Sequence, residues 1–176
     1  HSYQVRQIDA AGHLSDASAE VEYTLDTTAP ELVATIDVNE NETAIGNVLS
    51  SPENGLSFMI SGGADGGLFS IDDEGDLAFT AAQNYETPGD DDSDRIYEVE
   101  VTVTDVAGNQ TTQIINVNLQ NVNEAPEAQE IPDSMSVTGQ SYQLDVSTYF
   151  TDQDEGDVLT FSASGLPAGL SIDAST

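Results

Sequence analysis

The sequence predicts an all-β protein made of tandem β-sandwich modules with about seven strands each. Three observations lead to this fold class. Apolar and polar residues alternate with a period of two in several short runs, no window shows a convincing period of 3.6 residues, and the connections are rich in Gly, Pro, Asn and Asp. Alternating runs predict strands with one buried face, and the connections supply turn-forming residues.

The best-specified element is a hairpin between residues 97 and 119. Its first strand places Tyr97 and three valines, at positions 99, 101 and 103, on one face and glutamates and threonines on the other. Residues 107–109 form the turn, and the returning strand places Ile115, Val117 and Leu119 inward. We expect an antiparallel pair with one face in water.

An internal repeat divides the chain. Asp9 begins a five-residue segment that matches the segment beginning at Asp105, and Pro30 matches Pro126 at the same offset of 96 residues. A unit of about 100 residues is therefore expected in three copies, two of them partial. The expected modules are 1–29, 30–123 and 124–176, and the chain begins and ends inside these patterns, as an excerpt of a longer protein would.

The complete module should contain seven strands, and the first module two. In the first module we expect strands at 3–8 and 19–25. In the complete module the expected strands are 31–38, 43–49, 56–60, 68–71, 77–80, 96–104 and 113–120.

The charge balance restricts the possible partners. The chain has 33 acidic residues, two basic residues and no cysteine, and its formal net charge is −31. Nucleic acids and anionic membranes are disfavoured because both require clusters of Lys and Arg, and no run is apolar enough for direct membrane insertion. Cations are favoured, since two carboxylates about 4 Å apart repel by roughly 4 kcal/mol at an effective dielectric constant of about 20. A solvated acidic surface is the alternative.

Strand direction predicts where the acidic residues meet. If the seven strands alternate in direction, the end of the first strand and the loop before the sixth lie at the same end as the linker 121–126. The loop 152–155 of the following module then faces that linker. The residues expected at this junction are Glu40, Glu86, Asn121, Asn123, Glu124, Asp152 and Asp154.

The opposite end of the complete module should carry a second, poorer junction. The turn with Asp105 lies there, beside the upstream linker with Asp26. Carboxylate, amide and carbonyl oxygens without Cys or His are the ligands of a hard cation, so Ca²⁺ is the expected cofactor at both junctions. Because residues 50–53 lack the acidic pattern of 152–155, the first junction should hold fewer ions.

Several motifs resemble known surface-protein repeats. Residues 30–126 resemble a bacterial cadherin-like repeat, through Asn39-Glu40-Asn41, Phe69-Ser70-Ile71-Asp72, Asn84-Tyr85-Glu86 and a shortened, substituted linker at 121–126. Residues 126–176 resemble a dystroglycan-type cadherin-like module, and residues 1–30 are similar to the end of bacterial Ig-like repeats. The resemblance implies tandem Ig-like or cadherin-like sandwiches in the stalk of a large secreted adhesin of the RTX type.

This resemblance implies an extracellular, cell-surface extender that binds Ca²⁺ between neighbouring repeats and spaces a distal binding domain from the cell. One alternative is a module that itself binds a glycan, a peptide, another protein or a second copy of itself in cell–cell or biofilm adhesion, with Tyr85, Tyr142, Tyr149 and Phe150 as candidates. Another is a filament subunit joined by strand exchange. Catalysis is not expected, because neither a Ser-His-Asp nor a Cys-His arrangement can be drawn.

Two further segments attract attention. The run of acidic residues at 90–94 either holds an additional ion at the rim of the module or forms a solvated loop. The Gly- and Asp-rich segment 61–68 faintly resembles the nonapeptide that binds Ca²⁺ in parallel β-helices. Because that pattern occurs once here and lacks a second turn to share ligands, the segment is interpreted as a flexible loop.

Overall fold

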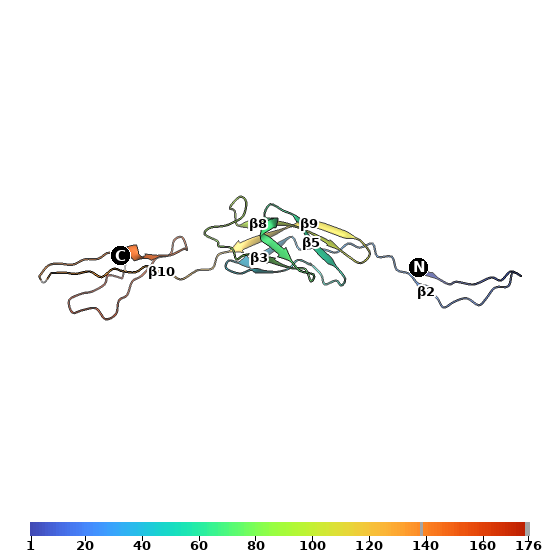
Figure 1. The fold of residues 1–176 in the computed structure, drawn as a ribbon, viewed down its shortest axis with the longest axis horizontal. Coiled ribbons are helices and arrows are strands. Elements are labelled where there is room, and N and C mark those ends of the chain that lie inside the picture. The colour runs from blue at the N-terminus through green and yellow to red at the C-terminus, as the bar shows by residue number, and fades with distance from the viewer. Residues whose placement is uncertain (138, 175–176) are drawn as a thin grey trace.

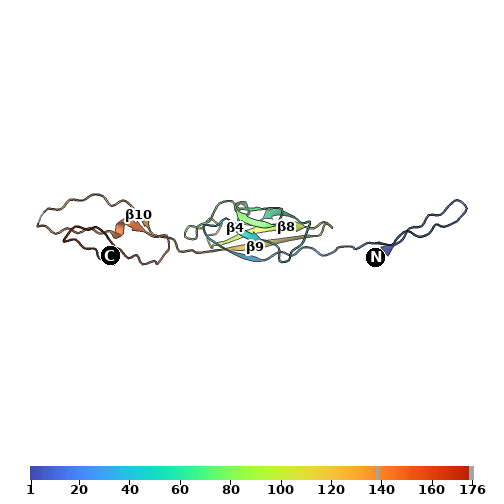
Figure 2. The ribbon, with the colours of Figure 1, turned by 90° about the horizontal axis from the view of Figure 1, so that it is seen from below.

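The computed structural model describes residues 1–137 and 139–174, which are all-β apart from two three-residue 3-10 turns, η1 (Gly66–Leu68) and η2 (Ser147–Tyr149). An N-terminal hairpin, a central β-sandwich and a C-terminal segment follow one another along the long axis (Figure 1). The view turned by 90° shows the same order (Figure 2). No helix in the described residues has the length and apolarity needed to cross a membrane.

Two sheets form the central sandwich. The first has the strand order β3-β9-β8-β5, with β3 (Thr35–Asn39), β5 (Ser57–Gly62), β8 (Ile96–Thr104) and β9 (Gln110–Gln120). The second has the order β4-β7-β6, with β4 (Ala44–Asn47), β6 (Phe69–Ile71) and β7 (Asp76–Phe79). Each of the seven strands expected between residues 31 and 120 is present, with ends displaced by a few residues.

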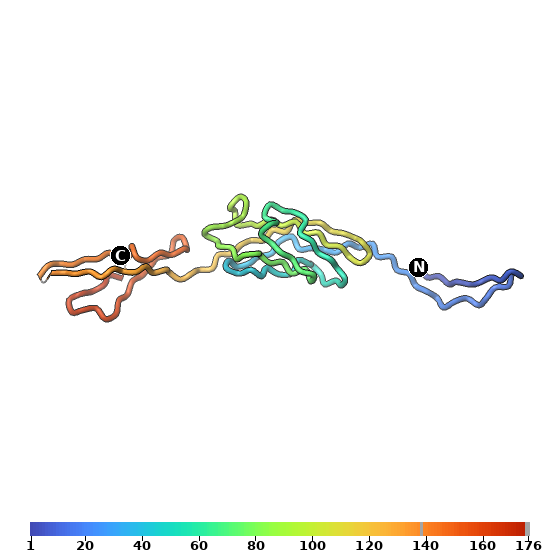
Figure 3. The backbone as a smooth tube through the Cα atoms, in the orientation of Figure 1, coloured from blue at the N-terminus to red at the C-terminus, as the bar shows by residue number. Residues whose placement is uncertain are grey.

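Strand direction follows the predicted alternation. β3 and β9, the first and last strands of the sandwich, pair in parallel, and the other pairs are antiparallel. The loop before β8 therefore lies at the end of the sandwich that faces the C-terminal segment, and the β8–β9 turn lies at the end that faces the N-terminal hairpin (Figure 3). One hairpin thus reaches both flanking segments.

The β8–β9 hairpin also builds the core. It pairs without interruption from Ile96 opposite Asn118 to Thr104 opposite Gln110. The side chains predicted to face inward are buried, which confirms the period-two interpretation: Tyr97, Val99, Val101, Val103, Ile115, Val117 and Leu119. Phe69 and Phe79 from the second sheet complete an aromatic cluster with Tyr97, the Phe79 and Tyr97 ring centroids being 5.0 Å apart.

The flanking segments have short strands. β1 (Ser2–Tyr3) pairs antiparallel with β2 (Val21–Glu22), and a single bridge joins Ile8 to Leu14, so the strands expected at 3–8 and 19–25 are found only in part. β10 (Glu127–Ala128) pairs antiparallel with β11 (Phe150–Thr151). Apolar side chains of the N-terminal hairpin remain exposed because, among the described residues, no second sheet packs over them.

The segment 61–68 is ordered, so its interpretation as a flexible loop is wrong. It contains the end of β5 and the η1 turn, and Asp65 between them is only 6% exposed. The Asp65 carboxylate accepts hydrogen bonds from the backbone N–H groups of Asp91 and Glu98, at 2.8 and 2.9 Å. The local glycine content suggested flexibility, but these long-range bonds anchor the segment.

Candidate metal centre

Glu40 organises the end of the sandwich that faces the C-terminal segment. It directly follows β3 and is only 2% exposed. Its Oε2 accepts a hydrogen bond from the Tyr85 N–H at 2.8 Å, and its Oε1 accepts one from the Val122 N–H at 2.9 Å. One buried carboxylate therefore joins the loop after β7 to the linker after β9. Because Tyr85 directly precedes Glu86 and Val122 lies two residues before Glu124, these two bonds bring Glu86 and Glu124 close to Glu40.

Glu40, Glu86 and Glu124 form the first acidic group of this junction. One carboxylate oxygen from each lies within 4.8 Å of those of the other two. Glu86 Oε1 accepts from the Asn121 side-chain amide at 3.1 Å, and Glu124 Oε1 accepts from the Asn41 side-chain amide at 2.6 Å. The second oxygens of Glu86 and Glu124 are buried without a hydrogen-bond partner. Such oxygens are costly to bury unless a cation or a donor satisfies them.

Desolvation and the crowding of carboxylates at this junction raise the pKa of Glu124. Loss of solvation raises the pKa of its carboxyl group above the ordinary value, and the neighbouring carboxylates of Glu40, Asp154 and Glu86 raise it further. The hydrogen bond from Asn41 opposes this shift. The junction is therefore a place where negative charge is disfavoured in the absence of a counter-ion.

A second acidic group comes from the C-terminal segment. Oxygens of Asp152, Asp154 and Asp157 lie within 4.8 Å of one another, and Asp152 Oδ2 is buried without a partner. Asp154 Oδ2 accepts a hydrogen bond from the Glu124 N–H at 2.8 Å, which links this group to the linker. Asp157 was missed from the sequence, although its position three residues after Asp154 in the same loop is a visible signal.

Other contacts cross the junction or lie beside it. The Asn84 side-chain amide donates to the Gln153 side-chain oxygen at 3.0 Å. A polar cleft of about 410 Å³ opens between the two segments, lined by Tyr85, Glu86, Arg95, Asn121, Gln153 and Glu155. The side-chain amide of Asn123, a predicted ligand, donates to the Glu124 carbonyl at 2.9 Å, within the linker itself.

The opposite junction contains Asp26, Glu53 and Asp105, whose nearest carboxylate oxygens also lie within 4.8 Å of one another. Glu53 was missed from the sequence. A signal existed, because Glu53 and Gly55 match Asp154 and Gly156 at a common offset of 101 residues. The structure therefore brings Asp26 and Asp105 together as expected, and it adds a third carboxylate.

Asp105 differs from Glu86 and Glu124 at the other junction because both of its oxygens accept hydrogen bonds. Its Oδ1 accepts from the Ala107 and Asn109 N–H groups, both at 2.8 Å, and its Oδ2 accepts from the Asn109 side-chain amide at 2.8 Å. The Asn109 side chain is the main cause that lowers the pKa of Asp105, and backbone N–H groups contribute. The same amide lies 3.4 Å from the carbonyl oxygens of Asp26 and Thr28.

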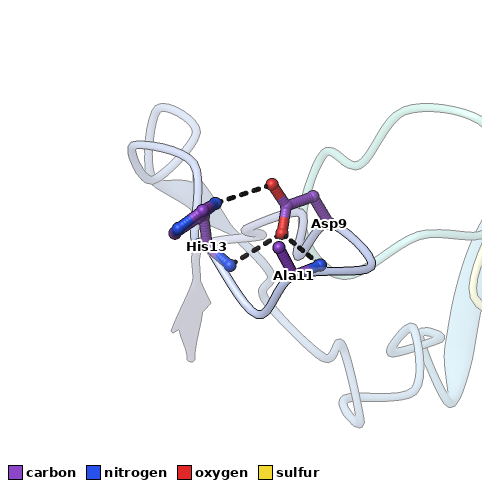
Figure 4. A network of polar contacts seen from close by, with 3 residues as sticks. All are labelled: Asp9, Ala11 and His13. Atoms are coloured by element: carbon purple, nitrogen blue, oxygen red, sulfur yellow. Dashed lines mark hydrogen bonds and ion pairs between the residues drawn. The ribbon is translucent and has the colours of Figure 1, made fainter.

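The same turn occurs in the N-terminal hairpin (Figure 4). Asp9 Oδ1 accepts from the Ala11 and His13 N–H groups at 2.9 and 2.8 Å, and Asp9 Oδ2 lies 2.9 Å from His13 Nδ1. Hydrogen bonds from His13 lower the pKa of Asp9. The Asp9 and Asp105 turns thus share their hydrogen-bond pattern at the 96-residue offset found in the sequence.

Two family models match the chain. Residues 26–118 match a family described as a bacterial Ig domain, and residues 125–176 match one described as a putative Ig domain. The first match spans more than half of the chain, so the chain belongs to the bacterial Ig domain family. A comparison with curated proteins returned no match.

Solved structures with similar folds include cadherin ectodomains. The chain is 20% identical to human protocadherin-24 EC1-2, with 74% of this chain and 62% of that chain covered and a TM-score of 0.47. It is 19% identical to the human desmocollin-1 ectodomain (62% and 22% covered, TM-score 0.41) and 18% identical to Drosophila N-cadherin EC1-3 (56% and 33% covered, TM-score 0.37). The chain spans less than two thirds of the length of each.

Proposed function

We propose that this chain is part of the extracellular stalk of a bacterial surface adhesin, in which calcium bound between modules stiffens the chain and spaces a distal binding domain from the cell. The proposed modules are 1–29, 30–123 and 124–176. The role is structural and not enzymatic, in keeping with membership of a bacterial Ig domain family. The partners proposed first are the neighbouring repeats of the same chain.

The observation that carries this proposal is a set of buried carboxylate oxygens without partners at one junction. Glu86 Oε2 and Glu124 Oε2 come from the sandwich and its linker, and Asp152 Oδ2 comes from the following segment. Asp154, bonded to the linker, connects the two acidic groups. A set of oxygen ligands without thiolate or imidazole suits a hard divalent cation such as Ca²⁺, which takes about six to eight oxygens.

The residues around the linker would produce the proposed stiffening by calcium. The linker 121–126 is six residues long between β9 and β10. Without a counter-ion, the carboxylates of Glu86, Glu124 and Asp152 repel one another across it. Bound calcium would supply the positive charge that lets these groups lie close together. Glu40, held by the Tyr85 and Val122 N–H groups, would keep the linker in place on the sandwich side.

The test combines solution scattering with calorimetry on the 176-residue chain. Calcium should lengthen the maximum dimension relative to EDTA and raise the melting temperature. The variant E86Q/E124Q should lose most of both responses, whereas the control E42Q/E98Q, which removes two charges at exposed positions outside the acidic groups, should retain them. Scattering profiles that are identical in calcium and EDTA would sink the proposal.

The alternative of a module that binds a glycan, a protein or its own copy has a separate test. Two of its aromatic candidates are already engaged, since Tyr85 lies under the Arg95 guanidinium and Phe150 packs against Phe161. Glycan-array binding or self-association of the wild-type chain, lost on Tyr142→Ala, would favour this alternative over a spacer.

A further inference from the structure

The acidic run 90–94 lies in the loop before β8, and its first residue is built into the sandwich while residues 91–94 are exposed. Asp90, its first residue, is only 6% exposed. Asp90 Oδ2 accepts hydrogen bonds from the Asp94 and Arg95 N–H groups at 2.7 and 3.1 Å. Asp90 Oδ1 is buried and has no partner. A buried carboxylate oxygen without a donor is costly, so this oxygen is available to bind a cation or a hydrogen-bond donor.

Two contacts fix the loop on the core from either side of Asp90. The Gly89 N–H donates to the Tyr97 hydroxyl at 3.0 Å, and the Asp91 N–H donates to the buried Asp65 carboxylate at 2.8 Å. Asp65 also accepts from the Glu98 N–H on β8. The position of Asp90 is therefore set by residues distant in the sequence, as expected of a pre-formed ligand.

Three carboxylates converge at this point. Oxygens of Asp90, Asp92 and Asp94 lie within 4.8 Å of one another. Their spacing of two residues resembles the first three ligand positions of a calcium loop, where alternate side chains turn toward one ion. Arg95 follows with a φ of 71°, in the left-handed region that such loops require at the position after the third ligand.

Arg95 does not neutralise the group. Its Nε–H donates to the Tyr85 carbonyl at 2.8 Å, and its guanidinium carbon lies 4.5 Å from the Tyr85 ring centroid. Within the described part of the chain, no ion pair joins an arginine to a carboxylate. The positive charge nearest in sequence is thus held against a carbonyl and an aromatic ring, and it makes no ion pair with Asp90.

We propose that Asp90, Asp92 and Asp94 form a binding site for a hard divalent cation of the calcium class, in the loop before β8 of the central sandwich and distinct from the acidic groups of both junctions. Asp90 is the buried anchor, and the exposed Asp92 and Asp94 supply the outer oxygens. The site does not depend on the proposed stalk function, because none of its ligands comes from a flanking segment.

The experiment is a calorimetric calcium titration of the 176-residue chain and its variants. Asp92→Asn should bind one calcium ion fewer than wild type. Its matched control, Asp91→Asn, removes the same charge from the same loop but lies outside the acidic group, and it should bind the wild-type number. Equal stoichiometry for Asp92→Asn and wild type would overturn the proposal, as would loss of an ion in Asp91→Asn alone.

A second variant separates this site from the junction. E86Q/E124Q/D154N should still bind the ion at Asp90, and calcium should shift the NMR signals of the Asp94 and Arg95 amides, which donate to Asp90. Unchanged amide signals at saturating calcium in that variant would contradict the site. The stalk proposal fails by a different result, namely wild-type stoichiometry in E86Q/E124Q/D154N.

Discussion

The two ends of the β8–β9 hairpin hold carboxylates in opposite electrostatic states. At the turn, Asp105 accepts three hydrogen bonds and the pKa of its carboxyl group is lowered. Past the other end, Glu124 has a buried oxygen without a partner and a raised pKa. Both ends contain three carboxylates within 4.8 Å. The number of acidic residues is therefore a poor guide to cation demand, and the supply of local N–H donors is a better one.

The supply of N–H donors is also the reason to expect different calcium affinities at the two junctions. The Asp105 turn supplies its own donors, so its carboxylate is stable without metal. At Glu124, the available donors are used by Glu40 and by one oxygen each of Glu86 and Glu124. We therefore expect tight calcium binding at the second junction and weak binding at the first.

The largest expected effect is a difference in backbone protection between the two linkers. Adding calcium should slow hydrogen exchange of the Val122 and Glu124 amides by about tenfold or more, because both donate to carboxylates of the junction. The linker 26–30 should change much less. Hydrogen-exchange mass spectrometry in calcium and EDTA measures both, and equal slowing at the two linkers would show that the two junctions bind calcium alike.

The next effect concerns stability without calcium. Asp105→Ala should lower the melting temperature by several degrees in EDTA, because three donors of the turn lose their acceptor. Glu124→Gln should act in the opposite direction and raise it slightly, since it removes a disfavoured charge. Calorimetry of both variants decides the matter, and a fall in both melting temperatures would show that the two sites are alike.

The pH dependence should also have opposite signs. The raised pKa of Glu124 contributes stability below its ordinary value of 4.5, and that stability is lost as pH rises through the raised pKa. The lowered pKa of Asp105 contributes stability above its ordinary value of 3.8, which is lost as pH falls through the lowered pKa. In EDTA, the melting temperature should therefore depend less on pH than in wild type. For Glu124→Gln this loss of dependence is expected just above pH 4.5, and for Asp105→Asn below pH 3.8.

The smallest effect tests Glu53 at the first junction. Glu53→Gln should weaken the residual calcium response of the linker 26–30 by a few-fold and leave the linker 121–126 unchanged, because among the described residues its carboxylate forms an acidic group with Asp26 and Asp105 alone. Site-resolved NMR titration follows both linkers in one sample. A response at 121–126 that changes along with the first would show that the junctions are coupled.

Much of the fold was predictable from local patterns. The alternation along residues 96–104 and 113–120 predicted which side chains are buried, because a strand's period of two leaves little choice once one face is apolar. The seven strands followed from the same patterns, and their directions followed from the alternation expected of an up-and-down sandwich. The order of segment 61–68 was not predictable, since Asp65 is anchored by N–H groups of Asp91 and Glu98.

The candidate site was predictable as a location more than as a ligand set. Alternating strand direction brought Glu40, Glu86 and Glu124 to one end, as expected. Their identity as calcium ligands stays a prediction. Asp157, Glu53 and the Asp90 group were missed or left open, because a carboxylate in a loop looks the same in sequence whether it is solvated or buried.

The sequence by itself determined the all-β class, the inward faces of the hairpin and the 96-residue repeat offset, because each follows from spacing along the chain. The ends at which acidic residues gather followed once the strands were expected to alternate in direction. Only the tertiary structure decided which of those carboxylates lack partners. Whether an oxygen such as Glu86 Oε2 or Asp90 Oδ1 finds a donor depends on N–H groups from segments distant in sequence. Glu40, satisfied by Tyr85 and Val122, shows the same physics with the opposite result.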